Sequence, residues 1–246
     1  TYEVGGVARL CGVQTKTIYG EKGIMLPADI TSAIREDDIH QPKTTLVCIE
    51  NTHNRAGGTV IPPDILKRTY DIAQKYEIPV HMDGARVFNA ATYLQVPVKE
   101  IAQYTDSIMV CLSKGLGAPV GSILAGTSDF IKKARRYRKM LGGGMRQGGF
   151  LAAAGIVALD TRLEGLAKDH ENARQLALGL ASIPGIEIDL DTVQTNIVLC
   201  DISGLGMTGS ELSRKLLEKA IKVNGGQGPW VRFVTHHQVQ EEDIHY

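Results

Sequence analysis

Short apolar runs alternate with amphipathic stretches through the earlier part of the chain. This alternation predicts repeated β-α-β units and a largely parallel sheet. The pattern indicates strands over Thr45–Glu50, Ile78–Asp83, Ser107–Leu112 and Gly121–Ala125. It also indicates a short helix over Val98–Tyr104 and a longer one over Pro63–Tyr76, whose inner face would carry Ile65, Thr69, Ile72, Ala73 and Tyr76.

The connection between the third and fourth expected strands is short. Too few residues lie between Leu112 and Gly121 for the crossover that two parallel strands need. The fourth strand should therefore run antiparallel to the third.

The second half of the chain has a different pattern. Ser128 is expected to cap a basic helix that ends at Met140, and glycines then precede a long Ala- and Leu-rich helical region. The further elements expected are this helical region over Phe150–Leu180, strands over Ile186–Leu190, Asn196–Cys200 and Trp230–Thr235, and a helix near Ser210–Lys219. We therefore predict a large α/β domain over residues 1–168 and a smaller α+β domain over residues 169–246. The chain lacks a starting Met and ends in what resembles a first helical turn, so we expect both domains to be truncated.

Composition narrows the possible partners. The 246 residues carry 27 basic and 27 acidic side chains, so no net field attracts nucleic acid or an anionic membrane. No apolar run reaches the ~20 residues of a membrane span. The four cysteines are far apart, which suits free thiols in a reducing cytoplasm. No HxH, HExxH or Cys/His cluster indicates a metal, and Tyr2–Ile18 scans only partly like the helix-turn-helix of a MerR-type regulator.

Two residues at expected strand ends point to cofactor chemistry. Asp83 ends one apolar strand and Lys114 follows the next, and ligands of open α/β sheets bind beyond the carboxyl ends of strands. A lysine amine can condense with the aldehyde of pyridoxal phosphate, while a carboxylate keeps the pyridine nitrogen protonated. Asp83 could instead cap the next segment, and a lone lysine is usually solvated. Here we expect Lys114 to be buried, which favours the neutral amine.

Other polar residues are candidates for the same site. Arg86 follows Asp83 closely enough to bind an anion in its pocket. Lys139 and Arg146 either point at a phosphate beside the glycines or belong to a solvated basic helix face. His40 and His53 could act as acid or base, or could simply be surface histidines.

Six segments together resemble the threonine aldolases. They are Glu50–Arg55, His81–Ala90, Cys111–Ser122, Arg138–Gln147, Asp169–Arg174 and Val231–His236. The resemblance covers essentially the whole chain, and it implies a pyridoxal phosphate enzyme of fold-type I that cleaves L-threonine or L-allo-threonine to glycine and acetaldehyde. It also implies a cytoplasmic homotetramer with active sites at subunit interfaces.

The resemblance also implies roles for individual residues. Lys114 would hold the cofactor covalently and Asp83 would pair with its pyridine nitrogen. Arg86 would contact cofactor and substrate, Arg232 would complete the carboxylate clamp, and Arg146 would be a phosphate or interface ligand. The remaining catalytic candidate is His40, near the substrate hydroxyl.

Some features depart from the family or leave alternatives open. The Ser-Gly-Thr phosphate turn and the histidine that stacks on the cofactor would lie upstream of Thr1, and Val223–Gly228 is unexpectedly rich in glycine. Another fold-type I lyase or racemase, acting on a different β-hydroxy amino acid, would use the same lysine and aspartate. A non-catalytic binding protein on this fold is the alternative from another class.

Overall fold

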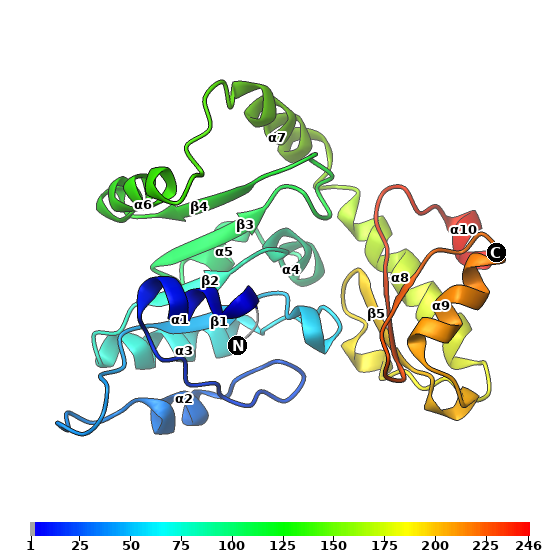
Figure 1. Cartoon of the computed structure of the whole chain (residues 1–246), viewed down its shortest axis with the longest axis horizontal. Coiled ribbons are helices and arrows are strands. Elements are labelled where there is room, and N and C mark those ends of the chain that lie inside the picture. The colour runs from blue at the N-terminus through cyan, green and yellow to red at the C-terminus, as the bar shows by residue number, and fades with distance from the viewer. Residues whose placement is uncertain (1–2) are drawn as a thin grey trace.

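The computed structural model describes residues 3–246 and contains two sheets (Figure 1). The larger sheet has strand order β1-β2-β3-β4 and the smaller has order β5-β7-β6. The helix α8 (Leu166–Ala181) lies between them in Figure 1. This arrangement confirms the α/β fold class.

The first three strands of the larger sheet are parallel, as the sequence predicts. These strands are β1 (Val47–Glu50), β2 (Val80–Asp83) and β3 (Ser107–Cys111), and they pair side by side in that order. The fourth strand, β4 (Ser122–Gly126), pairs antiparallel with β3, so the argument from the short connection is confirmed. The strands β2 and β3 thus lie in the interior of the sheet.

The helices of this sheet largely follow the expected pattern. The helices α3 (Pro63–Lys75) and α5 (Val98–Ala102) form as predicted, whereas α4 (Val87–Leu94) is an addition. In α3, Leu66, Thr69 and Ala73 are buried. Tyr76 was expected on this face but is 44% exposed, because it is the C-terminal cap and has left the helical conformation.

The chain from residue 122 to residue 161 forms an exposed projection that we call the outer arm. It comprises β4, α6 (Ser128–Met140) and α7 (Gly149–Thr161), which lie together at the top of Figure 1. Thr127 caps α6 by accepting a hydrogen bond from the Phe130 amide, so the cap lies one residue before Ser128, where it was expected. The single helix expected over Phe150–Leu180 is wrong as well, because residues 162–165 separate α7 from α8.

The smaller sheet contains β5 (Ile197–Asp201), β6 (Asn224–Gly225) and β7 (Trp230–Val234), all antiparallel. The helices α9 (Gly209–Leu217) and α10 (Glu241–His245) accompany it. The strand expected over Ile186–Leu190 does not form: only an isolated bridge joins Glu187 to Asp201. The Asp189 side chain accepts a hydrogen bond from the Asp191 amide and starts the turn η3 (Leu190–Thr192), which ends the extended segment.

The glycines near residue 225 have a packing role. Gly225 lies directly against the backbone of Gly209, so a side chain at either position would overlap the other residue. The Ser210 amide and hydroxyl donate to the Gly226 and Gly225 carbonyls at 2.8 and 3.2 Å. The glycine run therefore lets β6 contact the first turn of α9.

The remaining short elements lie near the start of the chain and in loops. They are η1 (Glu3–Gly5), α1 (Gly6–Cys11), α2 (Pro27–Ala33), η2 (Asn54–Ala56) and η4 (Ser203–Leu205). Over residues 3–18 no second helix follows α1, which does not favour a helix-turn-helix. None of the helices in residues 3–246 combines the length and apolar character needed to span a bilayer.

Helix α8 contacts both parts of the chain. Its first residue, Leu166, belongs to a cluster with Leu112 and Leu116 of the larger part, whereas Ala173 and Ala177 pack in the core of the smaller sheet. The division into residues 1–168 and 169–246 places the boundary in the first turn of α8, and it stays a prediction.

Candidate active site

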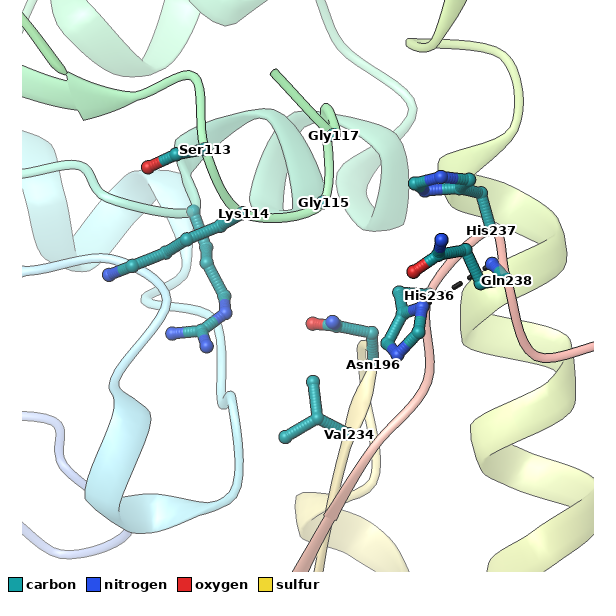
Figure 2. A pocket seen from close by; sticks show the side chains of 10 residues that line it. Ser113, Lys114, Gly115, Gly117, Asn196, Val234, His236, His237 and Gln238 are labelled. Carbon is teal, nitrogen blue, oxygen red and sulfur yellow. Dashed lines mark hydrogen bonds between the residues drawn. The ribbon is translucent and has the colours of Figure 1, made fainter. Parts of the chain in front are cut away.

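A cleft of about 370 Å³ lies between the loop that follows β3 and the end of β7 (Figure 2). The residues on the β3 side are Arg86, Ser113, Lys114, Gly115 and Gly117, and those opposite are Asn196, Val234, His236, His237 and Gln238. The two walls thus come from the larger and the smaller sheet, and both lie at strand ends.

Lys114 lies on the loop beyond the carboxyl end of β3. Two backbone hydrogen bonds shape this loop: the Gly117 amide donates to the Lys114 carbonyl at 2.8 Å and the Ala118 amide to the Leu112 carbonyl at 3.0 Å. In Figure 2 Lys114 lies on the side opposite Asn196 and His236, and its side chain points away from them. The expectation that Lys114 is buried is wrong: the residue is exposed and lies in the loop three residues beyond the end of β3.

Asp83 ends β2, the strand beside β3. Its Oδ1 atom accepts a hydrogen bond of 3.0 Å from the Ala85 amide, so the capping interpretation describes one of its two oxygens. The residue is half-buried and lies at the same sheet edge as the Lys114 loop. Capping and cofactor contact are therefore compatible roles for this carboxylate.

Arg86 and Arg232 converge on one acceptor. Both donate through Nη1 to Oδ1 of Asn54, at 3.4 Å from Arg86 and 2.7 Å from Arg232. Burial lowers the pKa of Arg86, and repulsion by Arg232 lowers it further. The Nε atom of Arg86 is buried and has no hydrogen-bond partner among the described residues. Two close cations with an unsatisfied donor form a site that an anion would stabilise.

Asn54 was not expected in the site, although it belongs to the segment Glu50–Arg55. Its amide donates to Oε1 of Glu50 at 2.9 Å, which fixes the turn after β1. His53, in the same turn, accepts a hydrogen bond from the Ala56 amide and lies 3.8 Å from Glu50. His53 therefore shapes the turn that presents Asn54 and does not line the cleft.

Two expected site residues lie elsewhere in this structure. The His40 side chain is 83% exposed and pairs with Asp38 at 2.9 Å on a loop before β1. Arg146 is exposed between α6 and α7 of the outer arm. Neither residue lines the cleft, so their roles at the site stay predictions.

His236 and His237 are additions to the expected site. The ring of His237 lies against Gly117, so any side chain at Gly117 would overlap it. The pKa of His237 is lowered by burial and then by the positive charges of Arg162 and His236. Their position in the sequence could have indicated a place in the site, because both histidines follow the strand that carries Arg232. Among the described residues no group of three or more His, Cys, Asp or Glu side chains could hold a metal ion.

Comparisons with known proteins agree with this geometry. Residues 1–203 match the family model of the beta-eliminating lyases. The chain is 42% identical over 249 residues to low-specificity L-threonine aldolase 1 of Arabidopsis thaliana, with 100% of the chain and 70% of the relative covered. It is 42% identical over 246 residues to the low specificity L-threonine aldolase of Escherichia coli strain K12, with 99% and 70% covered.

Solved structures show the same fold. A threonine aldolase of Leishmania major superposes with a TM-score of 0.82 at 22% identity, covering 100% of this chain and 71% of that one. An aspartate aminotransferase of Thermus thermophilus superposes with a TM-score of 0.62 at 17% identity, covering 89% and 57%. The fold is therefore that of the fold-type I pyridoxal phosphate enzymes.

The chain belongs to the beta-eliminating lyase family, and it is a pyridoxal phosphate-dependent lyase. Both relatives at 42% identity are low-specificity L-threonine aldolases. The residues at and beside the cleft fit this cofactor: Lys114 and Arg86, which has an unsatisfied donor, line the cleft. Asp83 at the end of β2 and Arg232, which shares the Asn54 oxygen with Arg86, do not line it but lie on neighbouring elements.

Proposed function

We propose that this protein cleaves L-threonine and L-allo-threonine to glycine and acetaldehyde with pyridoxal 5'-phosphate as cofactor. The observation that carries the proposal is the convergence of Arg86 and Arg232 on Asn54 in the part of the molecule that also presents Lys114. This arrangement supplies an anion clamp beside an amine, as an enzyme needs for an α-amino acid. The threonine aldolase relatives support the substrate.

Four residues would hold the cofactor. Lys114 would bind its aldehyde carbon through Nζ, Asp83 would keep the pyridine nitrogen protonated, and Arg86 would add positive charge. Arg146 is proposed as a phosphate ligand. When bound, the cofactor supplies an electron sink for the pair released as the Cα–Cβ bond breaks.

The guanidinium pair sets the course of the reaction. Arg86 and Arg232 would bind the substrate carboxylate in place of the Asn54 oxygen that they now share. Holding the carboxylate fixes rotation about the bond between the substrate nitrogen and Cα, and this rotation decides which bond to Cα breaks. For an aldolase that bond is Cα–Cβ. A base then removes the proton of the β-hydroxyl group, and we propose His40 for this role.

The placement of His40 and Arg146 supports a homotetramer with shared active sites. Both side chains are exposed and lie outside the cleft, so a second subunit would have to bring them to it. Apolar side chains of the outer arm are also exposed, among them Phe150 at 91%. Exposed apolar patches commonly mark interaction surfaces. We propose a cytoplasmic location, which the four free cysteines support.

A first experiment tests cofactor and lysine together. The full-length protein loaded with pyridoxal phosphate should absorb near about 420 nm, and borohydride should fix the cofactor on the Lys114 peptide. Acetaldehyde release from L-threonine and L-allo-threonine is then compared with turnover of other β-hydroxy amino acids and with racemisation.

The outcomes separate the candidate functions. Lys114→Ala should lose the absorbance band, the trapped adduct and acetaldehyde release. An adduct on Lys114 without threonine cleavage would favour another lyase or a racemase. Absence of any adduct in the unmodified protein would favour a non-catalytic binding protein.

A further inference from the structure

A buried asparagine lies among the elements that carry Arg86, Lys114 and Arg232. Asn89 is 2% exposed and lies in the first turn of α4, which begins directly after Arg86. Its Nδ2 group donates to Nε2 of His170 on α8 at 3.0 Å and lies 3.5 Å from Oδ1 of Asn196 before β5. One side chain thereby joins three elements of the fold.

The same side chain lies under the Lys114 loop. A methyl group placed on Gly115 would come within 3.4 Å of Oδ1 of Asn89 and 2.9 Å of Leu166. The loop therefore lies close to the start of α8, with the Asn89 side chain beside the space next to Gly115. Moving the Asn89 side chain would leave space beneath the residue that follows Lys114.

The connection continues to the strand of Arg232. Asn196, also 2% exposed, donates through Nδ2 to the Thr235 carbonyl at 2.9 Å, and the Thr235 amide donates to the Asn196 carbonyl at 3.0 Å. The Thr235 hydroxyl donates to the Asp169 carbonyl on α8 at 2.6 Å. The strand end that follows Arg232 is thus tied to α8, the helix whose His170 accepts the hydrogen bond from Asn89.

We propose that Asn89, held by His170, is a positioning residue that aligns Lys114 with the Arg86–Arg232 pair. The proposal rests on the proposed function for its consequence in turnover, but not for its consequence in structure. Buried polar side chains are stable only when their partners are fixed, so each partner of Asn89 constrains the others. Asn89 contacts neither Asn54 nor the proposed ligands, and it acts through the elements that carry them.

The chain offers a matched control on the same helix as His170. Asn172 is as buried as Asn89 and donates one hydrogen bond of 3.0 Å, to the Val239 carbonyl, two residues beyond His237. Asn89→Ala and Asn172→Ala therefore remove the same group from equally buried positions. Asn172→Ala reaches the loop only through the segment whose His237 ring lies against Gly117, whereas Asn89→Ala acts beside Gly115, so the larger disturbance of the loop is expected from Asn89→Ala.

Hydrogen exchange of the cofactor-free protein gives a readout that needs no turnover. The amides of Gly117 and Ala118 make the two backbone hydrogen bonds of the loop. They should exchange about tenfold faster in Asn89→Ala than in Asn172→Ala, because local opening follows the loss of buried contacts. Equal exchange in the two variants overturns the positioning role.

Kinetics of the loaded enzyme extend the test. Asn89→Ala should keep the cofactor on Lys114 but lower kcat/KM for threonine about tenfold, mainly through KM, as misaligned binding groups do. Asn172→Ala should stay within about twofold of the unmodified enzyme. An unchanged kcat/KM in Asn89→Ala also overturns the proposal.

Two variants of the acceptor provide a rescue that does not depend on Asn89→Ala folding. His170→Gln retains an oxygen that can accept from Asn89, whereas His170→Leu does not. The glutamine variant should keep the slow exchange and kcat/KM of the unmodified protein, and the leucine variant should behave as Asn89→Ala. Equal behaviour of both variants overturns the role of the hydrogen bond. If the unmodified enzyme releases no acetaldehyde, the proposed function fails, while the exchange comparison still decides the positioning role.

Discussion

The arginines of the cleft and the basic residues of the outer arm differ in how much of the molecule surrounds them. Arg86, in the turn between β2 and α4, and Arg232, on β7, share the Asn54 oxygen, and Arg86 also lines the cleft. Arg146 and Lys139 lie exposed on a projection in which few side chains are buried. An anion bound in the cleft would meet a preformed site, whereas one bound at the arm would need a further surface. The comparison separates an arginine pair whose contacts all come from one chain from basic residues that would need a second surface to form an anion site.

The largest effect is expected at the clamp. Arg232→Ala should lower kcat/KM for threonine about a thousandfold, because a bidentate contact with a carboxylate is lost and Arg86 alone cannot fix its orientation. Steady-state acetaldehyde release measures it, and Arg214→Ala on the exposed face of α9 is the control. A loss no greater than that of the control would remove Arg232 from the substrate site.

A smaller effect, on the free energy of unfolding, distinguishes the core that packs against the larger sheet from the outer arm. Leu66 of α3 is 1% exposed, so Leu66→Ala should lower the free energy of unfolding by about 3 kcal/mol through the lost burial and the cavity. Ile156 of α7 is 59% exposed, so Ile156→Ala should change it by less than about 0.5 kcal/mol at dilutions where the chain is monomeric. Urea titrations compare the two. Similar losses would show that the outer arm is packed in the monomer.

The role of association can be tested through Arg146. If a second subunit brings this residue to the cleft, Arg146→Ala should weaken cofactor binding about tenfold, as loss of one charged phosphate contact does. Phe150→Glu should weaken it similarly by disrupting the apolar face of the arm. Cofactor titrations and sedimentation measure both properties. Normal cofactor binding by a dissociated Phe150→Glu protein would contradict the shared site.

The smallest effect concerns pH and two neighbouring residues of α8. Burial lowers the pKa of His170 from 6.5 to about 4, so the unfolded chain takes up this proton first and stability falls as pH drops from 6.5 towards 4. Burial raises the pKa of Asp169 from 3.8 to about 6, so its stabilising contribution is present below pH 3.8 and is lost as pH rises through 6. The changes in stability with pH that come from His170 and from Asp169 therefore have opposite signs.

Replacing His170 removes its contribution to the pH dependence and leaves that of Asp169. His170→Gln should therefore gain stability relative to the unmodified protein as pH falls from 6.5 to 4. Urea midpoints at several pH values within this window measure the difference. Parallel curves for the two proteins would show that His170 is not buried in its neutral form.

Local patterns were sufficient to predict most of the sheet. The apolar runs before Asp83 and before Lys114 form strands, and the short link after Leu112 correctly indicated an antiparallel partner. Failures occurred where an element ended within a segment whose pattern predicted that it continues. Asp189 turns the chain where a strand was expected, and residues 162–165 separate α7 from α8 where one helix was expected.

The site was predicted in part for a related reason. Asp83 and Arg86 are close in sequence and follow one strand, so their proximity could be inferred locally. The contact of Arg232 with Asn54 joins residues 178 positions apart. Only the family resemblance, and no local pattern, suggested a role for Arg232. The exposure of Lys114 could not be inferred either, because it depends on how the loop after β3 packs and not on the apolar run that precedes it.

The position of the Lys114 loop has a consequence for how the enzyme acquires its cofactor. Lys114 is exposed in the folded chain and lines a cleft between the larger and the smaller part of the chain. Loading is then a docking event that follows folding and does not guide it. Protein depleted of pyridoxal phosphate should regain its absorbance at a rate proportional to added cofactor, without a lag and without passing through denaturant.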